Sequence, residues 1–237
     1  MIIPRLTVVT LMTGLVAALG GPGLIAAPLK PTEARLIDNF EQLGIDNTAP
    51  RFGWVVNDPA RNAVQSGYQI VVARSQAELD SGSGLVWDSG KVASSEQFGV
   101  KYAGAALEKT TEYWWKVRTW DAQGEASPWS EGRHFVTSFF KPEDWNPQAV
   151  WIGDGLGTVP PTKPAPEFRK EFQINKPVRG AYLYICGLGQ FSALINGARV
   201  GDHVMDPAWT DYDQTATYVT FDVTTLVAQG GNALGGN

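Results

Sequence analysis

Apolar and polar residues alternate in short runs along this chain, and no run after residue 27 keeps the spacing of an amphipathic helix for three turns. In the run 112–120, Trp115 and Val117 alternate with Lys116 and Arg118. Because successive side chains of a strand point to opposite faces, this alternation predicts a strand between a core and solvent. Further runs lie at 68–73, 85–88 and 133–137. Together they predict a first β-sandwich.

A second set of β-like runs is separated from the first by two proline-rich segments, 141–147 and 159–166. Proline cannot donate to a strand ladder, so we expect both segments to be loops or connectors. The Asn196-Gly197 pair between two apolar runs is the strongest short signal for a hairpin. The strands predicted in this second all-β unit lie at 167–174, 181–188, 191–195, 199–200, 216–223 and 232–234.

Residues 1–27 differ from the rest of the chain. Arg5 gives a short basic start, residues 6–19 are apolar, residues 21–23 break the run, and residues 25–27 offer a small-residue cleavage site. This order predicts a secretory signal peptide, because its apolar core is short for a membrane span. An uncleaved N-terminal anchor is the alternative. No second apolar stretch approaches membrane length, so we expect no membrane contact after cleavage.

Composition narrows the possible functions. The 237 residues are 11% aromatic and 18% charged with a net charge of −5, which indicates a folded protein. Without a basic run, the sequence lacks the electrostatic footprint of a nucleic-acid partner.

Few residues are available for metal or redox chemistry. The single cysteine, Cys186, excludes an intramolecular disulfide framework and is interpreted as a buried core thiol rather than a redox group. His134 and His203 show no spacing of a ligand pair and no carboxylate pattern, so both are interpreted as ordinary strand or loop residues.

Two series of motifs carry a family resemblance. The first comprises Thr48-Ala-Pro-Arg-Phe-Gly-Trp54, Tyr113-Trp-Trp-Lys-Val-Arg-Thr-Trp-Asp121, Ser127-Pro-Trp-Ser130 and Phe135. It resembles the fibronectin-III-like module that opens many bacterial α-L-rhamnosidases. The second comprises Phe172, Gly187-Leu-Gly189, Ile195-Asn-Gly-Ala-Arg-Val-Gly201, Asp206-Pro-Ala-Trp-Thr-Asp-Tyr212, Tyr218-Val-Thr-Phe-Asp-Val223 and Gly231-Asn-Ala-Leu-Gly235. It resembles the N-terminal jelly-roll domain of α-L-rhamnosidases in glycoside hydrolase family 78.

The resemblance implies an all-β chain of two consecutive β-sandwiches. The fibronectin-III-like sandwich is placed at 28–141 and the jelly roll at 142–237, where we expect it to be truncated, because the family pattern continues past Gly235. In this family a C-terminal α/α-barrel hydrolyses terminal α-L-rhamnosyl residues. No long helical series exists in this sequence, so no catalytic residue is carried over and we expect the chain alone to be inactive.

The resemblance and the predicted signal peptide also indicate the partners and the cellular location of the protein. The implied partners are rhamnose-containing glycans or glycosides and the α/α-barrel domain of a longer bacterial enzyme, secreted or periplasmic. A stand-alone carbohydrate-binding or adhesion module is the rival hypothesis. A structural spacer whose aromatic residues are all core is the third.

A candidate carbohydrate site lies at Trp209, Asp211 and Tyr212. Flat aromatic rings with a polar group nearby suit the apolar face of a sugar. The alternative is that Trp209 fills a core or a domain seam. On a strand, Asp211 and Asp213 would share a face about 6.6–6.8 Å apart, near the spacing of an inverting glycosidase pair. A polar loop with Asx-turn chemistry is the simpler interpretation of these two aspartates.

No cofactor is expected to be required, but Ca²⁺ is a candidate. Asp154, Asp202 and the carbonyl of Pro207 lie in predicted loops and offer the oxygen ligands that calcium prefers. Some jelly-roll carbohydrate modules similar to this one hold calcium beside the sugar. Because no EF-hand spacing is present, solvated loop acids are the alternative interpretation.

Overall fold

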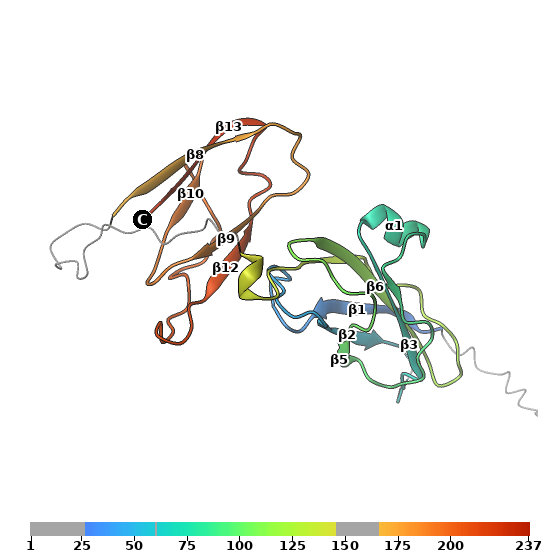
Figure 1. Ribbon diagram of the computed structural model, residues 1–237. Helices are drawn as coiled ribbons and strands as arrows, with labels where there is room; N and C mark the ends of the chain where they lie inside the picture. The colour runs from blue at the N-terminus through green and yellow to red at the C-terminus, as the bar shows by residue number, and fades with distance from the viewer. Residues whose placement is uncertain (1–26, 60, 146–165) are drawn as a thin grey trace, which may run out of the picture.

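In a computed structural model of the chain, residues 27–59, 61–145 and 166–237 are described. Residues 1–26 of the expected signal peptide, Asp154 and most of the second proline-rich segment lie outside these residues. Figure 1 shows two β-rich lobes side by side, one with strands β1–β7 and the other with strands β8–β13. Among the described residues, no helix has the length and apolar character needed to cross a membrane. The prediction of an all-β chain of two β-rich units is confirmed.

The first domain consists of two antiparallel sheets. One has the order β1-β2-β5, with β1 at Leu29–Leu36, β2 at Arg51–Asn57 and β5 at Phe98–Lys101. The other has the order β4-β3-β6-β7, with β4 at Trp87–Asp88, β3 at Gly67–Ala73, β6 at Glu112–Trp120 and β7 at Arg133–Val136. A short 3₁₀ helix, η1 (Pro142–Asp144), follows β7 and faces the second domain (Figure 1).

The core of the first domain follows from the alternation along β6. Trp115 and Val117 are fully buried, and the ring of Trp115 lies 4.6 Å from that of Phe52 on the opposite sheet. On the outer face, the guanidinium of Arg118 lies 4.9 Å from the ring of Trp120 and 4.7 Å from that of Trp129. Through these cation–π contacts, the two indole rings pack against the charged side chain on the outer face, so both faces of β6 are packed.

A short α-helix, α1 (Gln76–Ser81), covers part of the outer face of β3. Its Leu79 is buried with Val71 and Ala73, which explains why every residue of β3 is buried. Ser75 caps the first turn by accepting a hydrogen bond from the backbone N–H of Glu78.

The second domain has one four-stranded and one two-stranded sheet. The larger has the order β11-β10-β13-β8, with β11 at Ala198–Arg199, β10 at Ala193–Ile195, β13 at Gly230–Gly236 and β8 at Phe168–Ile174. The smaller pairs β12 (Tyr218–Asp222) with β9 (Tyr182–Cys186). The predicted hairpin is confirmed, because Asn196 and Gly197 both have positive φ and join β10 to β11.

Cys186 differs from its prediction as a buried core thiol. It is half-buried at the end of β9, and its Sγ donates a hydrogen bond to the carbonyl of Thr217 at 3.0 Å. Partial burial raises the pKa of this thiol, which keeps it protonated and poorly nucleophilic.

The two domains meet through a seam of tyrosines and backbone. The hydroxyl of Tyr184 donates to the carbonyl of Thr137 at 3.0 Å, and that of Tyr218 donates to Ser138 Oγ at 2.6 Å. The ring of Phe139 lies 5.0 Å from that of Tyr184. Burial raises the pKa of Tyr184 to about 12, so this hydroxyl stays a donor at physiological pH. The seam therefore joins β9 and β12 to the segment that follows β7.

Candidate functional site

The predicted carbohydrate residues lie in the long connection between β11 and β12. Trp209 is 81% exposed, and its ring lies 5.7 Å from that of Tyr212 with the planes inclined at 38°. Trp209 therefore lies neither in a core nor in the seam between these two domains, and the hypothesis that every aromatic residue is core is wrong. Because tryptophan is usually well buried, such an exposed ring beside a second aromatic ring is a candidate binding platform.

The turn after Trp209 is polar and ordered. Asp211 Oδ1 accepts from the backbone N–H of Asp213 at 3.2 Å, and Asp211 Oδ2 accepts from Gln214 Nε2 at 2.8 Å. This is the predicted Asx-turn, and the idea that Asp211 and Asp213 share a strand face is wrong. Both aspartates are exposed, outside the kind of dry pocket in which a catalytic acid works.

Two side-chain hydrogen bonds close the base of this loop. Thr210 Oγ1 donates to the carbonyl of Thr215 at 2.6 Å, and Thr217 Oγ1 donates to the carbonyl of Ala208 at 3.2 Å. We call residues 208–217 the aromatic loop. The two closures hold its backbone, so the exposed pair is presented by a defined turn.

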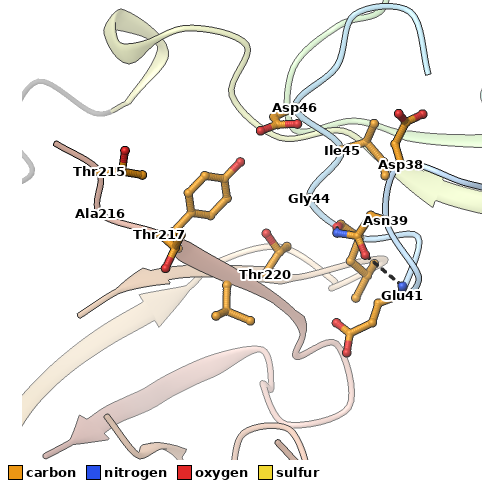
Figure 2. A pocket seen from close by; sticks show the side chains of 13 residues that line it. Asp38, Asn39, Glu41, Gly44, Ile45, Asp46, Thr215, Ala216, Thr217 and Thr220 are labelled. Carbon is orange, nitrogen blue, oxygen red and sulfur yellow. Dashed lines mark hydrogen bonds between the residues drawn. The ribbon is translucent and has the colours of Figure 1, made fainter. Parts of the chain in front are cut away.

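The C-terminal arm of the aromatic loop reaches a pocket at the seam, shown in Figure 2. The pocket has a volume of about 420 Å³ and lies between residues of 38–46 in the first domain and 215–220 in the second. Its acidic and amide side chains are Asp38, Asn39, Glu41 and Asp46. None of the described lining residues carries a positive charge, so the pocket disfavours anionic ligands.

His203 is not the ordinary loop residue predicted from the sequence. Its Nδ1 lies 2.7 Å from Asp206 Oδ2, and its Nε2 contacts Glu41 of the first domain. Burial lowers the pKa of His203, but hydrogen bonds to Asp206 and Glu41 outweigh it, so the net shift is upward. Glu41 is 162 residues away in sequence, which explains why no local carboxylate pattern revealed this contact.

His134 matches its prediction as a strand residue. It lies on β7, 44% of its side chain is exposed, and its ring stands edge-on to Trp114 at 5.0 Å. Its Nδ1 is 3.8 Å from a carboxylate oxygen of Glu112 on the neighbouring strand.

The predicted calcium ligands are only partly placed. Asp202 is exposed and Pro207 is buried within the same connection, whereas Asp154 lies outside the described residues. Within 27–59, 61–145 and 166–237, no group of three or more His, Cys, Asp or Glu side chains is arranged to hold a metal ion. Calcium binding at these positions stays a prediction.

Comparisons with known families match both domains. Residues 32–141 match the family described as "Rha78A-like, N-terminal immunoglobulin domain". Residues 176–236 match the family described as "Alpha-L-rhamnosidase N-terminal domain".

Individual proteins with similar sequences are α-L-rhamnosidases. One from Formosa agariphila is 36% identical over 219 residues, which is 81% of this chain and 22% of the relative. One from an Alteromonas species is 33% identical, covering 87% of this chain and 23% of the relative. The chain thus spans less than a quarter of the length of these relatives.

Solved structures of α-L-rhamnosidases have the same arrangement of strands. The enzyme from Dictyoglumus thermophilum matches with a TM-score of 0.75 and 35% identity, covering 88% of this chain and 25% of that one. The enzyme from Aspergillus terreus matches with a TM-score of 0.72 and 30% identity, covering 87% and 23% respectively. At these coverages, both similarities extend over the two domains.

Proposed function

The chain belongs to the α-L-rhamnosidase family through two domains of its N-terminal region, and from this premise we propose that it serves as a non-catalytic part that recognises carbohydrate. Its ligands are rhamnose-containing glycans or glycosides, and its second role is to support the catalytic domain of a longer enzyme. Binding energy supplied here would act at a distance from the reacting bond. The shared order of both domains in longer enzymes supports this proposal over a stand-alone adhesion module.

The observation that carries the proposal is the exposed pair Trp209 and Tyr212. An indole ring with 81% of its surface in water contributes little to folding, so a binding role explains its presence in an ordered loop. Rhamnose offers an apolar ring face and a methyl group to such a platform. Its hydroxyls can donate to Asp211, whose carboxylate retains free acceptor positions beside the two bonds it already accepts.

A calorimetric titration of the full chain with methyl α-L-rhamnoside tests the proposal. We expect saturable binding that weakens at least about tenfold in Trp209→Ala, because the stacking surface is lost. Phe98→Ala is the matched control, since Phe98 is 71% exposed on β5 of the other domain. Equal binding by Trp209→Ala and the wild type contradicts the assignment, as does the absence of any binding.

We also propose that residues 1–27 direct export of the protein from a bacterial cell to the periplasm or the medium. Expression of the whole chain in a secreting bacterium should give a soluble product that begins at Pro28. A product that stays in the membrane fraction and retains Met1 supports the anchor alternative instead.

A further inference from the structure

The turn that presents the ring of Tyr212 also carries two exposed carboxylates. Asp211 directly precedes Tyr212 and Asp213 directly follows it, and both aspartates are exposed. The backbone carbonyl of Asp211 accepts from the N–H groups of Gln214 at 2.9 Å and of Thr215 at 2.8 Å. These two bonds close a tight turn. Both carboxylates therefore stay on the short ordered segment that holds the aromatic ring.

No positive charge neutralises these two aspartates. Residues 208–217 contain no Lys, Arg or His. Among the described residues, neither Asp211 nor Asp213 forms an ion pair, and the carboxylate of Asp213 forms no hydrogen bond. The two donors to the carboxylate of Asp211 are uncharged amide groups, which leave its charge in place. The platform formed by Trp209 and Tyr212 is therefore surrounded by uncompensated negative charge.

The pocket at the seam extends this acidic surface. Residues 215–217 of the aromatic loop line it together with Asp46 of the first domain (Figure 2). Burial raises the pKa of the Tyr218 hydroxyl, and the negative charge of Asp46 raises it further, so the field of Asp46 reaches the second domain. Asp38 differs, because its charge is paired with Arg51. The C-terminal arm of the loop is thus acidic on both sides.

Charge distinguishes ligands that the aromatic rings cannot. A rhamnose unit presents the same apolar face whether the next sugar is neutral or anionic, so stacking on Trp209 does not separate the two. A carboxylate or sulfate on the next unit would lie about one sugar ring from the turn, within the Debye length of about 8 Å at physiological ionic strength. Asp213 repels an anion at that distance, whereas a neutral unit meets no such repulsion.

We propose that Asp213, together with Asp211, restricts the platform to neutral rhamnose-containing glycans and disfavours chains in which rhamnose is linked to a uronate or a sulfated sugar. The inference rests on the proposed recognition of carbohydrate by Trp209 and Tyr212, and it adds the class of glycan. Asp213 acts through its charge, whereas Asp211 also accepts hydrogen bonds from the sugar. Selectivity of this kind arises because the wrong ligand is repelled.

The test uses two ligands that differ by one charge. One is a disaccharide of α-L-rhamnose linked to galacturonate, and the other is the same disaccharide with its carboxylate reduced to an alcohol. Each is titrated by calorimetry into the full chain at about 0.01 M and at about 1 M salt, between which the Debye length falls from about 30 Å to about 3 Å. We expect the neutral disaccharide to bind about 5–10-fold more tightly at low salt and less than about twofold more tightly at high salt.

Two substitutions of Asp213 test its role directly. Asp213→Asn removes the charge and keeps the size, so it should lower the ratio of the two affinities at least about twofold at low salt. Asp213→Lys reverses the charge and should make the anionic disaccharide the tighter ligand. Because the side chain is exposed and unpaired among the described residues, neither change disturbs the turn. Glu125→Gln, at an exposed carboxylate of the first domain, is the control and should leave the ratio unchanged.

The outcomes separate this inference from the proposed function. Equal affinities for the two disaccharides at low salt overturn the inference, although binding of both still supports carbohydrate recognition. A preference for the neutral ligand that persists at high salt or in both Asp213 variants shows that shape, not charge, selects the ligand, and it also overturns the inference. A wild-type chain that binds neither disaccharide nor methyl α-L-rhamnoside contradicts the proposed function and this inference together.

Discussion

The two domains achieve stability differently. In the first, fifteen buried residues form one apolar cluster between two sheets, and β3 pairs with β6 over seven residues. In the second, the corresponding cluster has five buried residues among the part of the chain that the structure describes, and every residue of β9 is only half-buried. The difference indicates that apolar packing in its own core stabilises the first domain. The stability of the second domain depends more on buried side-chain hydrogen bonds and on the seam.

The largest expected effect is in the core of the first domain. Trp115→Ala removes a fully buried indole that packs on Phe52, and it should lower the free energy of unfolding by about 3–5 kcal/mol. Because Trp115 Nε1 has no hydrogen-bond partner among the described residues, the loss comes from packing. Urea denaturation measures it. A loss below about 1 kcal/mol contradicts the picture of a self-sufficient core.

In the second domain, loss of a buried side-chain hydrogen-bond network should lower the free energy of unfolding more than loss of a half-buried apolar side chain. Asn232 is 5% exposed and bonds to Ala228, Gly230 and Asn196. Asn232→Ala should cost about 1–3 kcal/mol, because the backbone groups of Ala228 and Gly230 lose the buried amide that they bond to. Leu234→Ala, at a half-buried apolar position two residues later, is the comparison and should cost less. The reverse order, in denaturation curves of the two variants, shows that the small core dominates after all.

The seam can be tested with two glycines of nearly equal φ. Gly44 has φ +69° and a close neighbour in Thr220, whereas Gly82 has φ +68° and nothing within 4 Å of its ideal Cβ. Both changes to alanine incur the strain of positive φ, but Gly44→Ala also pushes the domains apart, so it should cost about 1 kcal/mol more. If Gly44→Ala and Gly82→Ala lower the thermal midpoint equally, the close contact between residue 44 and Thr220 does not contribute to stability.

The smallest effect is expected at the aromatic loop. Trp209→Ala should change the free energy of unfolding by no more than about 0.5 kcal/mol, since the ring is 81% exposed. The same variant is expected to lose carbohydrate affinity. A destabilisation above about 1 kcal/mol would identify Trp209 as a structural residue, in contrast to the platform proposed here.

Sequence patterns predict the regular parts of this fold well. The alternation along 112–120 and the Asn196-Gly197 turn locate β6 and the β10–β11 hairpin. Strand β1 escapes prediction because register shifts between Leu29 and Arg35 replace its two-residue alternation. Helix α1 is too short, at six residues, to show a helical period.

The sequence predicts only those parts of the candidate site whose residues lie close together along the chain. Trp209, Asp211 and Tyr212 lie within four residues, so their clustering is visible in the sequence, although the exposure of Trp209 is not. The contact between Glu41 and His203 and the seam pocket depend on how the domains pack. That packing is set by the seam residues around Tyr184 and Tyr218, which local patterns do not reveal.

The most direct test of carbohydrate recognition observes the nine tryptophan indole N–H signals of the full chain by nuclear magnetic resonance during titration with methyl α-L-rhamnoside. The Trp209→Phe variant identifies the Trp209 signal by its disappearance. We expect this signal to shift saturably while that of Trp115, buried in the first domain, stays fixed. A Trp209 signal that does not move at saturating sugar contradicts the account.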